Sequence, residues 1–195
     1  QDYPEAMSQL SNGHPYDMAT NIFDSLPQIF FDQEPQDGLD YIQLYGRTGN
    51  ERVYKYVRSA YVNEVKNLYK WKVFVPSASG AGTLGETLTT PIIGAPGVGN
   101  TETFISIGVF GTIEEAEAAM SYIKTKFARV LLGVLKITQH ISPDKWRYVP
   151  LQNFTPASDI DWTKSIPEID QQLYKKYGLD ETEIQFIETH VKEMT

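Results

Sequence analysis

Residues 112–138 read TIEEAEAAMSYIKTKFARVLLGVLKIT and contain the clearest periodic pattern in the chain. Thr112 followed three residues later by Glu115 forms a capping box, which is typical of a helix start. Apolar residues then recur at helical spacing, so the pattern predicts one long amphipathic helix over about 113–137. The opposite face carries a polar ridge, in which three of five residues are cationic: Tyr122, Lys126, Arg129, Gly133 and Lys136.

Short segments with a two-residue period flank this helix and predict strands. Tyr41–Tyr45 and Arg52–Val57 are two of them, and Thr48-Gly49-Asn50 between them suits a hairpin turn. A polar, glycine-rich stretch over 77–99 separates the remaining strands. Those strands are predicted at Trp71–Val75, Thr103–Phe110 and Trp146–Phe154, the last as an edge or bent strand because it contains Pro150.

Two further capping signals lie near the C-terminus. Ser165 with Glu168, and Asp180 with Glu183, predict an αα-hairpin over about 165–193, with a break at Gly178. The chain therefore reads as α+β, with short, mostly antiparallel strands and glycine-rich loops around one long helix. We expect one structural unit made of a poorly defined N-terminal segment, an α+β domain and a helical tail packed on it, over residues 1–38, 39–155 and 156–195.

Composition narrows the classes of function. The chain has 195 residues, 41% of them hydrophobic, which is enough to bury a substantial core without covalent links. Cysteine is absent, which excludes disulfides, thiolate metal sites and cysteine nucleophiles. No stretch approaches 18 apolar residues and no basic-then-apolar leader is present, so we expect neither a membrane span nor a secretion signal.

The net charge of −8 conceals an uneven distribution. Thirteen of the 17 basic residues fall in two windows, 47–72 and 122–150, and each window has a net charge of +5. If the fold joins these windows, the protein has one basic face on an acidic body, which suits a polyanion. The alternative is that both windows are ordinary solvated surface.

Familiar catalytic motifs are incomplete in this chain. Gly80-x-Gly82-x-x-Gly85 follows a strand, but no helix opens at the third glycine, as a dinucleotide-binding motif requires. No P-loop and no Gly-x-Ser-x-Gly elbow is present, and no histidine has a partner at metal-binding spacing. Glu64-x-Lys66 and Pro143-Asp144 are the only fragments that suggest a metal-dependent nuclease, and they occur in the reverse of the usual order.

Several polar residues have the chemistry of DNA contacts. Lysine and arginine suit phosphates and guanine, glutamine suits adenine, and glycine loops allow close approach of the backbone to a large ligand. The alternative for each is a solvated face or a strand start. The candidate DNA-binding residues are Arg47, Arg52, Lys72, Ser77, Ser79, Gly80, Gly82, Thr101, Glu102, Thr103, Lys124, Lys126, Arg129 and Gln139.

A series of tracts over residues 40–195 resembles the C-terminal target-recognition region of bacterial restriction–modification enzymes. These enzymes are adenine-specific DNA methyltransferases, many of them fused to an endonuclease (type IIG and relatives). Tyr122–Arg129 and 149–179 are the most specific of the matching tracts. The others are Lys72–Val75, Gly80–Gly82, Thr101–Phe104 and Glu114–Glu117.

The resemblance implies a bacterial, cytoplasmic module that binds duplex DNA and selects the sequence that an attached catalytic domain methylates or cleaves. It also implies S-adenosylmethionine, and Mg²⁺ for cleavage, in the parent enzyme. The chain lacks the Asn-Pro-Pro-Tyr type motif of the methyltransferases, so we expect no cofactor and no catalytic residue here, only a part of a larger enzyme. Two alternatives remain: a Mg²⁺-dependent nuclease, and an interaction module whose acidic αα-hairpin docks on other domains.

Overall fold

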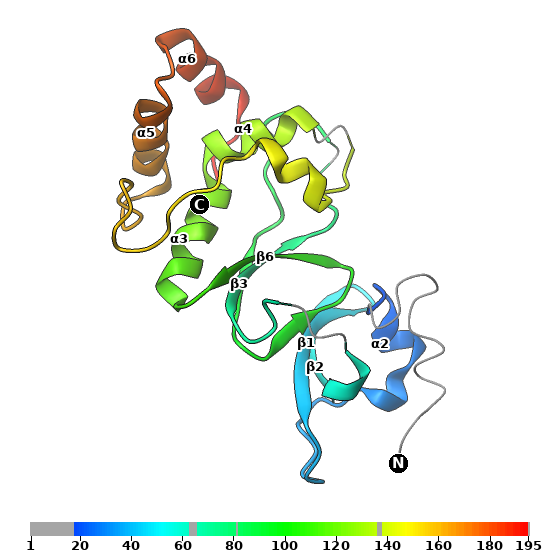
Figure 1. Cartoon of the computed structure of the whole chain (residues 1–195). Helices are drawn as coiled ribbons and strands as arrows, with labels where there is room; N and C mark the ends of the chain where they lie inside the picture. The colour runs from blue at the N-terminus through cyan, green and yellow to red at the C-terminus, as the bar shows by residue number, and fades with distance from the viewer. Residues whose placement is uncertain (1–17, 63–65, 81, 136–137, 195) are drawn as a thin grey trace.

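The computed structural model describes residues 18–62, 66–80, 82–135 and 138–194. It confirms the α+β class, with two three-stranded sheets and a set of helices gathered at one end of the molecule (Figure 1). The other end is formed by a projecting β-hairpin (Figure 1). Among the described residues, no helix has the length and apolar character needed to cross a membrane.

The first sheet contains the projecting hairpin. Strands β1 (Tyr41–Thr48) and β2 (Glu51–Arg58) pair antiparallel, and β5 (Val98–Asn100) adds in parallel to β1. Thr48 pairs directly with Glu51, so the turn has only two residues, and Gly49 takes a φ of +55°. That backbone conformation favours glycine, which explains why the predicted turn forms here.

The N-terminal segment packs on this sheet. Helix α2 (Ile22–Ser25) and the 3-10 turn η1 (Pro27–Ile29) share a core with inward residues of the hairpin and with the turn η2 (Ser59–Tyr61). Phe31, at the end of the apolar run, exchanges backbone hydrogen bonds with Tyr56 of β2. Residues 18–38 are therefore part of the end of the molecule that contains the β1–β2 hairpin, which we call the ribbon end.

The second sheet lies between the β1–β2 hairpin, which we call the ribbon, and the helices (Figure 1). Its order is β4 (Ile92–Gly94), β3 (Trp71–Pro76) and β6 (Phe104–Phe110), with antiparallel pairing throughout. Helix α3 (Ile113–Lys124) begins at Thr112, whose side chain accepts a hydrogen bond from the Glu115 amide as the capping box predicts. Its apolar residues share a core with those of β3 and β6.

The prediction of one long helix is wrong, because the helix breaks at Thr125. Helix α4 (Lys126–Leu135) starts anew after Thr125, which has a ψ of 150°. The Oγ1 atom of Thr125 accepts from the Ala128 amide at 3.1 Å. The carboxylate of Asp170 accepts from the amides of Lys126 and Phe127 at 3.0 and 2.9 Å. These contacts satisfy amides that an unbroken helix would bond to its own carbonyls.

The αα-hairpin is confirmed. Helices α5 (Ile166–Tyr177) and α6 (Glu181–His190) both start with the predicted capping boxes, and Gly178 between them takes a φ of +66°. Ile169, Leu173 and Ile187 on their inner faces are buried in a core shared with α3 and α4.

Residues 146–154 do not form the predicted strand. They contain the end of a 3-10 helix, η3 (Pro143–Tyr148), followed by an extended segment that runs along the helices (Figure 1). The Pro150 carbonyl accepts from the Tyr122 hydroxyl at 2.8 Å and from the Gln152 side-chain amide at 3.1 Å. Hydrogen bonds from side chains therefore take the place of the backbone hydrogen bonds that a neighbouring strand would have supplied.

Candidate nucleic-acid interface

One face of the β1–β2 hairpin carries polar and aromatic side chains from end to end. Alternate residues of a strand point to the same face, so each cross-strand pair on that face is defined by the register. The other face is largely the core face, with Ile42, Leu44 and Val57 buried. The four pairs on the polar face contain no acidic residue: Arg47 with Arg52, Tyr45 with Tyr54, Gln43 with Tyr56, and Tyr41 with Arg58. We call these eight residues the ribbon face.

Arg52 is the exposed cation of the ribbon face. Its guanidinium carbon lies 5.4 Å from the ring centroid of Phe104, so the cation rests on an aromatic ring. Among the described residues, its guanidinium has no hydrogen-bond or ion-pair partner. Phe104 stacks on Tyr45 at 4.3 Å, and Tyr45 lies 4.8 Å from the 42% exposed Tyr54. Arg52 therefore presents its donors to solvent from a supported position.

Arg47, directly opposite, is engaged with the turn. Its Nε and one terminal nitrogen donate to the Gly49 carbonyl at 2.9 and 2.7 Å. The same terminal nitrogen also lies 3.3 Å from the Asn50 side-chain oxygen. Two arginines facing each other across a ladder repel, so this engagement stabilises Arg47 in the folded turn.

The predicted segment Thr101–Thr103 adjoins the ribbon, but Thr101 faces inward. Its amide donates to the Tyr45 carbonyl at 3.0 Å, and its fully buried hydroxyl donates to Thr103. Glu102 is exposed, Thr103 is half-buried, and the Ser77 hydroxyl donates to the Glu102 carbonyl at 2.8 Å. The prediction that Thr101 contacts DNA is therefore wrong, because its side chain is buried. Glu102 and Thr103 reach the surface.

Lys72 is not a phosphate contact. Its side chain is only 1% exposed, and its ammonium group donates to the carbonyls of Asn67 and Leu68 at 2.8 and 2.7 Å. Burial lowers the pKa of Lys72 to about 8. The charge binds the preceding turn to β3 and is unavailable to a ligand.

The glycine loop wraps around a carboxylate of its own chain. The Gly82 amide donates to Glu86 Oε1 at 2.9 Å, and a Cβ atom on Gly80 would lie 2.2 Å from the same carboxylate. Ser79 is buried, with its hydroxyl accepting from the Thr89 amide at 2.7 Å. Gln139 is exposed, and its carbonyl accepts from the Ser79 amide at 2.8 Å. The Glu86 carboxylate therefore occupies the side of this loop to which a DNA phosphate would bind.

The polar ridge of the long helix is covered by the αα-hairpin. Arg129 is 3% exposed and donates to the carbonyls of Lys124, Glu86 and Lys192. The Lys126 ammonium pairs with Glu188 of α6. Lys124 is half-buried at the end of α3 and Tyr122 is buried, while Lys136 lies outside the described residues. The expectation that Arg129 contacts DNA is wrong, because this ridge is the packing seam for α5 and α6.

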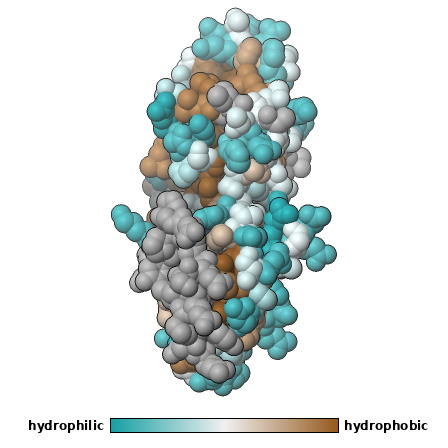
Figure 2. All heavy atoms as spheres, turned by 90° about the vertical axis from the view of Figure 1, so that its right-hand side faces the viewer, coloured by the Kyte–Doolittle hydropathy of each residue, from teal (hydrophilic) through white to brown (hydrophobic). Residues whose placement is uncertain are grey.

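The two basic windows do not join into one face. The hairpin tip and the α4–η3 region lie at opposite ends of an elongated molecule (Figure 1). The side view shows the same elongated outline, with apolar surface in its upper part and also beside the grey residues lower down (Figure 2). Any single polyanion surface on this protein therefore belongs to one end only.

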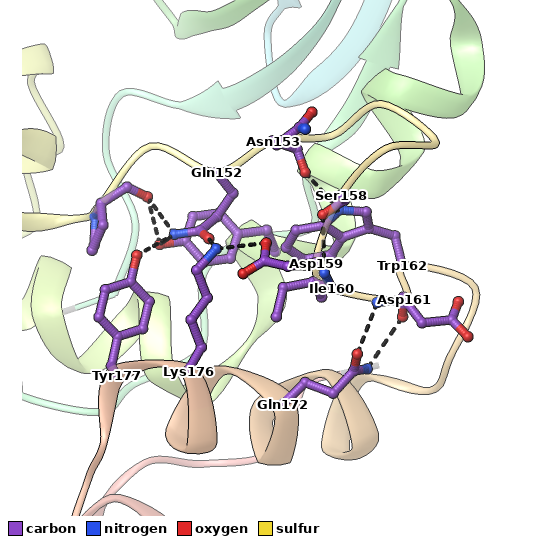
Figure 3. Close-up of polar contacts among 12 residues, drawn as sticks. Gln152, Asn153, Ser158, Asp159, Ile160, Asp161, Trp162, Gln172, Lys176 and Tyr177 are labelled. Carbon is purple, nitrogen blue, oxygen red and sulfur yellow. Dashed lines mark hydrogen bonds and ion pairs between the residues drawn. The ribbon is translucent and has the colours of Figure 1, made fainter.

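The second specific tract, 149–179, has a structural function. The Lys176 ammonium donates to Gln152 Oε1 at 2.9 Å and to Asp159 at 2.8 Å. The Gln152 side-chain amide donates to the Tyr177 hydroxyl at 2.7 Å. Figure 3 shows these side chains converging between the extended segment and α5. They attach residues 149–162 to the helical end.

The nuclease fragments do not form a cluster in the described part of the chain. Asp144 bonds Ser142 and pairs with Lys145 at 3.3 Å. Glu64 lies outside the described residues. No group of three or more His, Asp or Glu side chains within the described ranges is placed to hold a metal ion.

Six residues of the ribbon face are absent from the sequence-based candidates: Tyr41, Gln43, Tyr45, Tyr54, Tyr56 and Arg58. Strand alternation on both sides of the Gly49-Asn50 turn would have placed them beside Arg47 and Arg52. The signal is present in the sequence, but it lies in the face that each residue occupies and not in the number of basic residues.

Comparison with known proteins adds no family assignment. No protein-family model, curated protein or solved structure matches this chain. The case for a function therefore depends on the geometry of the chain itself.

Proposed function

We propose that this chain is the DNA-recognition module of a bacterial restriction–modification enzyme, and that its ribbon face contacts duplex DNA. In this proposal the module acts in the cytoplasm. It selects the sequence that a catalytic domain outside this chain methylates with S-adenosylmethionine or cleaves with Mg²⁺. The observation that carries the proposal is the projecting hairpin, whose polar face is built from arginine, tyrosine and glutamine side chains. A carboxylate meets this face at the end away from the tip, where Asp37 accepts a hydrogen bond from Tyr41 at 2.9 Å.

The dimensions and chemistry of the hairpin favour duplex DNA. The major groove of B-DNA admits a two-stranded β-ribbon. Arginine and glutamine donors match guanine and adenine edges, and tyrosine hydroxyls donate to phosphates. Because the turn has two residues, the tip is narrow and both strands keep their register to its end.

Charge pairing within the chain leaves few cations available to a polyanion. Several lysines pair with carboxylates, whereas Arg52 on the ribbon and Arg147 on η3 have no ion-pair partner among the described residues of this protein of net charge −8. The rest of the protein is acidic and repels DNA phosphates that approach anywhere except the ribbon face. Binding should therefore be moderate in strength and sensitive to salt. The neutralised pairs in the described part of the chain are Lys55–Asp32 on β2 and, in the helical end, Lys126–Glu188, Lys145–Asp144, Lys164–Asp161 and Lys176–Asp159.

The test is binding of a randomised duplex pool by fluorescence anisotropy at about 50 and 200 mM salt, with sequencing of the bound DNA. The unmodified chain is expected to bind with salt sensitivity and to enrich a motif. The double variant Arg52→Ala/Tyr54→Ala should weaken binding by at least about tenfold, because it removes a cation and an exposed ring from the ribbon face.

A matched control lies at the other end of the molecule. Arg147 rests over the exposed Tyr148 ring at 5.1 Å, so Arg147→Ala/Tyr148→Ala removes the same two chemical groups from η3. This variant should bind as the unmodified chain does. Equal losses in both variants would argue against the ribbon as the interface, and no duplex binding at the lower salt would overturn the proposed function.

A further inference from the structure

We infer that Arg52 selects a guanine in the DNA site and that Arg47 is a positioning residue that holds the hairpin turn. This inference rests on the proposed function. It assigns different roles to two arginines that look equivalent in sequence. They face each other in the same cross-strand pair, but their contacts differ.

Arg52 presents an oriented fork that no described residue bonds. A guanidinium offers five N–H donors in one plane, and two of them match the O6 and N7 acceptors of guanine. Phe104 lies under the Arg52 guanidinium at 5.4 Å, and that ring is itself held by stacking on Tyr45 at 4.3 Å. The support reduces the entropy lost when the fork meets a base, which favours a geometric contact over a diffuse charge contact.

Arg47 cannot present the same fork. Two of its three guanidinium nitrogens donate to the turn, where the Gly49 carbonyl accepts both at 2.9 and 2.7 Å. Contact with guanine would require it to give up these bonds. Arg47 therefore acts through the turn, by fixing the shape of the tip from which Arg52 projects.

The position of Arg52 on the ribbon favours a base edge over a phosphate. It lies one cross-strand pair from the tip, between Tyr54 and the turn. In the proposed complex, a ribbon that enters the major groove by its tip would bring Arg52 within reach of base edges. Phosphates line the groove walls, where flexible cations at the ribbon margins serve equally well.

The experiment starts from the motif enriched by the unmodified chain. Each guanine of the motif is replaced in turn by 7-deazaguanine, which lacks the N7 acceptor but keeps Watson–Crick pairing. At one position the unmodified chain should lose about 5- to 150-fold in affinity. Arg52→Ala should bind the normal and the 7-deaza duplex equally, since the contact is already absent.

Two further variants separate charge from geometry and contact from positioning. Arg52→Lys keeps the charge but loses the fork, so it should retain the salt dependence and lose the preference for guanine. Arg47→Ala should weaken all duplexes alike and lower the melting temperature, while the preference for guanine is kept. Circular dichroism establishes that each variant is folded.

The outcomes distinguish the two claims. If the unmodified chain binds DNA but Arg52→Ala and Arg52→Lys enrich the same guanine, the assignment of Arg52 is overturned and the proposed function stands. If Arg47→Ala is the variant that loses the guanine, the roles are reversed and the inference fails. If the unmodified chain binds no duplex, the proposed function fails and the inference fails with it.

Discussion

Buried cations are the clearest feature of this protein at the scale of single residues. Lys72 and Arg129 have the residue types of phosphate contacts, yet each donates to backbone carbonyls inside the molecule. A carbonyl buried without a donor costs about 1–3 kcal/mol, so a long cationic side chain that reaches several of them contributes to stability. Residue type alone therefore does not distinguish these two buried cations from the exposed Arg52.

Lys72→Ala tests this structural role. The substitution leaves the Asn67 and Leu68 carbonyls without their donor, so we expect a loss of roughly 2–4 kcal/mol in the free energy of unfolding. Urea denaturation measures that loss. The dependence of DNA binding on salt should stay unchanged below the unfolding transition, whereas a decrease in that slope would mean that Lys72 contacts a phosphate after all.

At the scale of elements, the break between α3 and α4 depends on a contact distant in sequence. Asp170 of α5 caps the first amides of α4 although 44 residues separate it from Lys126. Burial raises the pKa of Asp170 to about 6, and the neighbouring Glu188 charge also raises it. The two bonded amides and Arg129 lower it. A buried, partly compensated carboxylate thus joins the αα-hairpin to the rest of the helical end.

The carboxylate makes stability depend on pH in a defined direction. The folded pKa of about 6 exceeds the ordinary value of 3.8, so the folded state binds more protons than the unfolded state between these values. The contribution of Asp170 is therefore fully present below pH 3.8 and is lost progressively as the pH rises through 6. Relative to Asp170→Asn, the unmodified chain should lose roughly 2–3 kcal/mol between pH 4 and 7. Urea unfolding at several pH values measures this difference, and parallel curves would contradict it.

Local signals predicted the elements that local contacts stabilise. The hairpin at Gly49-Asn50, the capping boxes at Ser165 and Asp180, and the end of α5 at Gly178 all depend on residues within a few positions, and each is confirmed. At Thr112 the N-cap is confirmed, but the Glu115 carboxylate accepts from the Gly111 amide and so does not complete the box. The break at Thr125 and the loss of the 146–154 strand depend on Asp170 and Tyr122, which are distant in sequence. The candidate site lies between these cases, because strand alternation predicts its face but only the fold shows which arginine is free.

At the scale of the whole molecule, an aromatic stack joins the ribbon end to the helical end. Tyr45 of β1 stacks on Phe104 of β6 at 4.3 Å and on Phe74 of β3 at 5.9 Å. The two sheets meet at these rings, which are all buried. The stack also carries Arg52, so the ribbon face and the joint between the two sheets share the same ring, Phe104.

Tyr45→Ala should weaken this joint. Removal of a buried aromatic ring costs about 3–5 kcal/mol, and here the loss falls on the contact between the sheets. We expect amide hydrogens of β1 and β2 to exchange with solvent before those of α5 and α6 in this variant. In the unmodified chain we expect the two groups to exchange together. Hydrogen-exchange mass spectrometry measures both, and simultaneous exposure in the variant would show that other contacts couple the two ends.

The two-residue turn between β1 and β2 limits how this surface can be altered. Point substitutions on the ribbon face leave the backbone in place, so the surface that we propose to read DNA can vary one side chain at a time. A single residue inserted in β2 before Val53 has a different effect, because it exchanges the inward and outward sets beyond it and sends Val53 and Val57 outward. Under the proposed function, new specificities should therefore arise by replacement of residues and by exchange of whole hairpins of equal length.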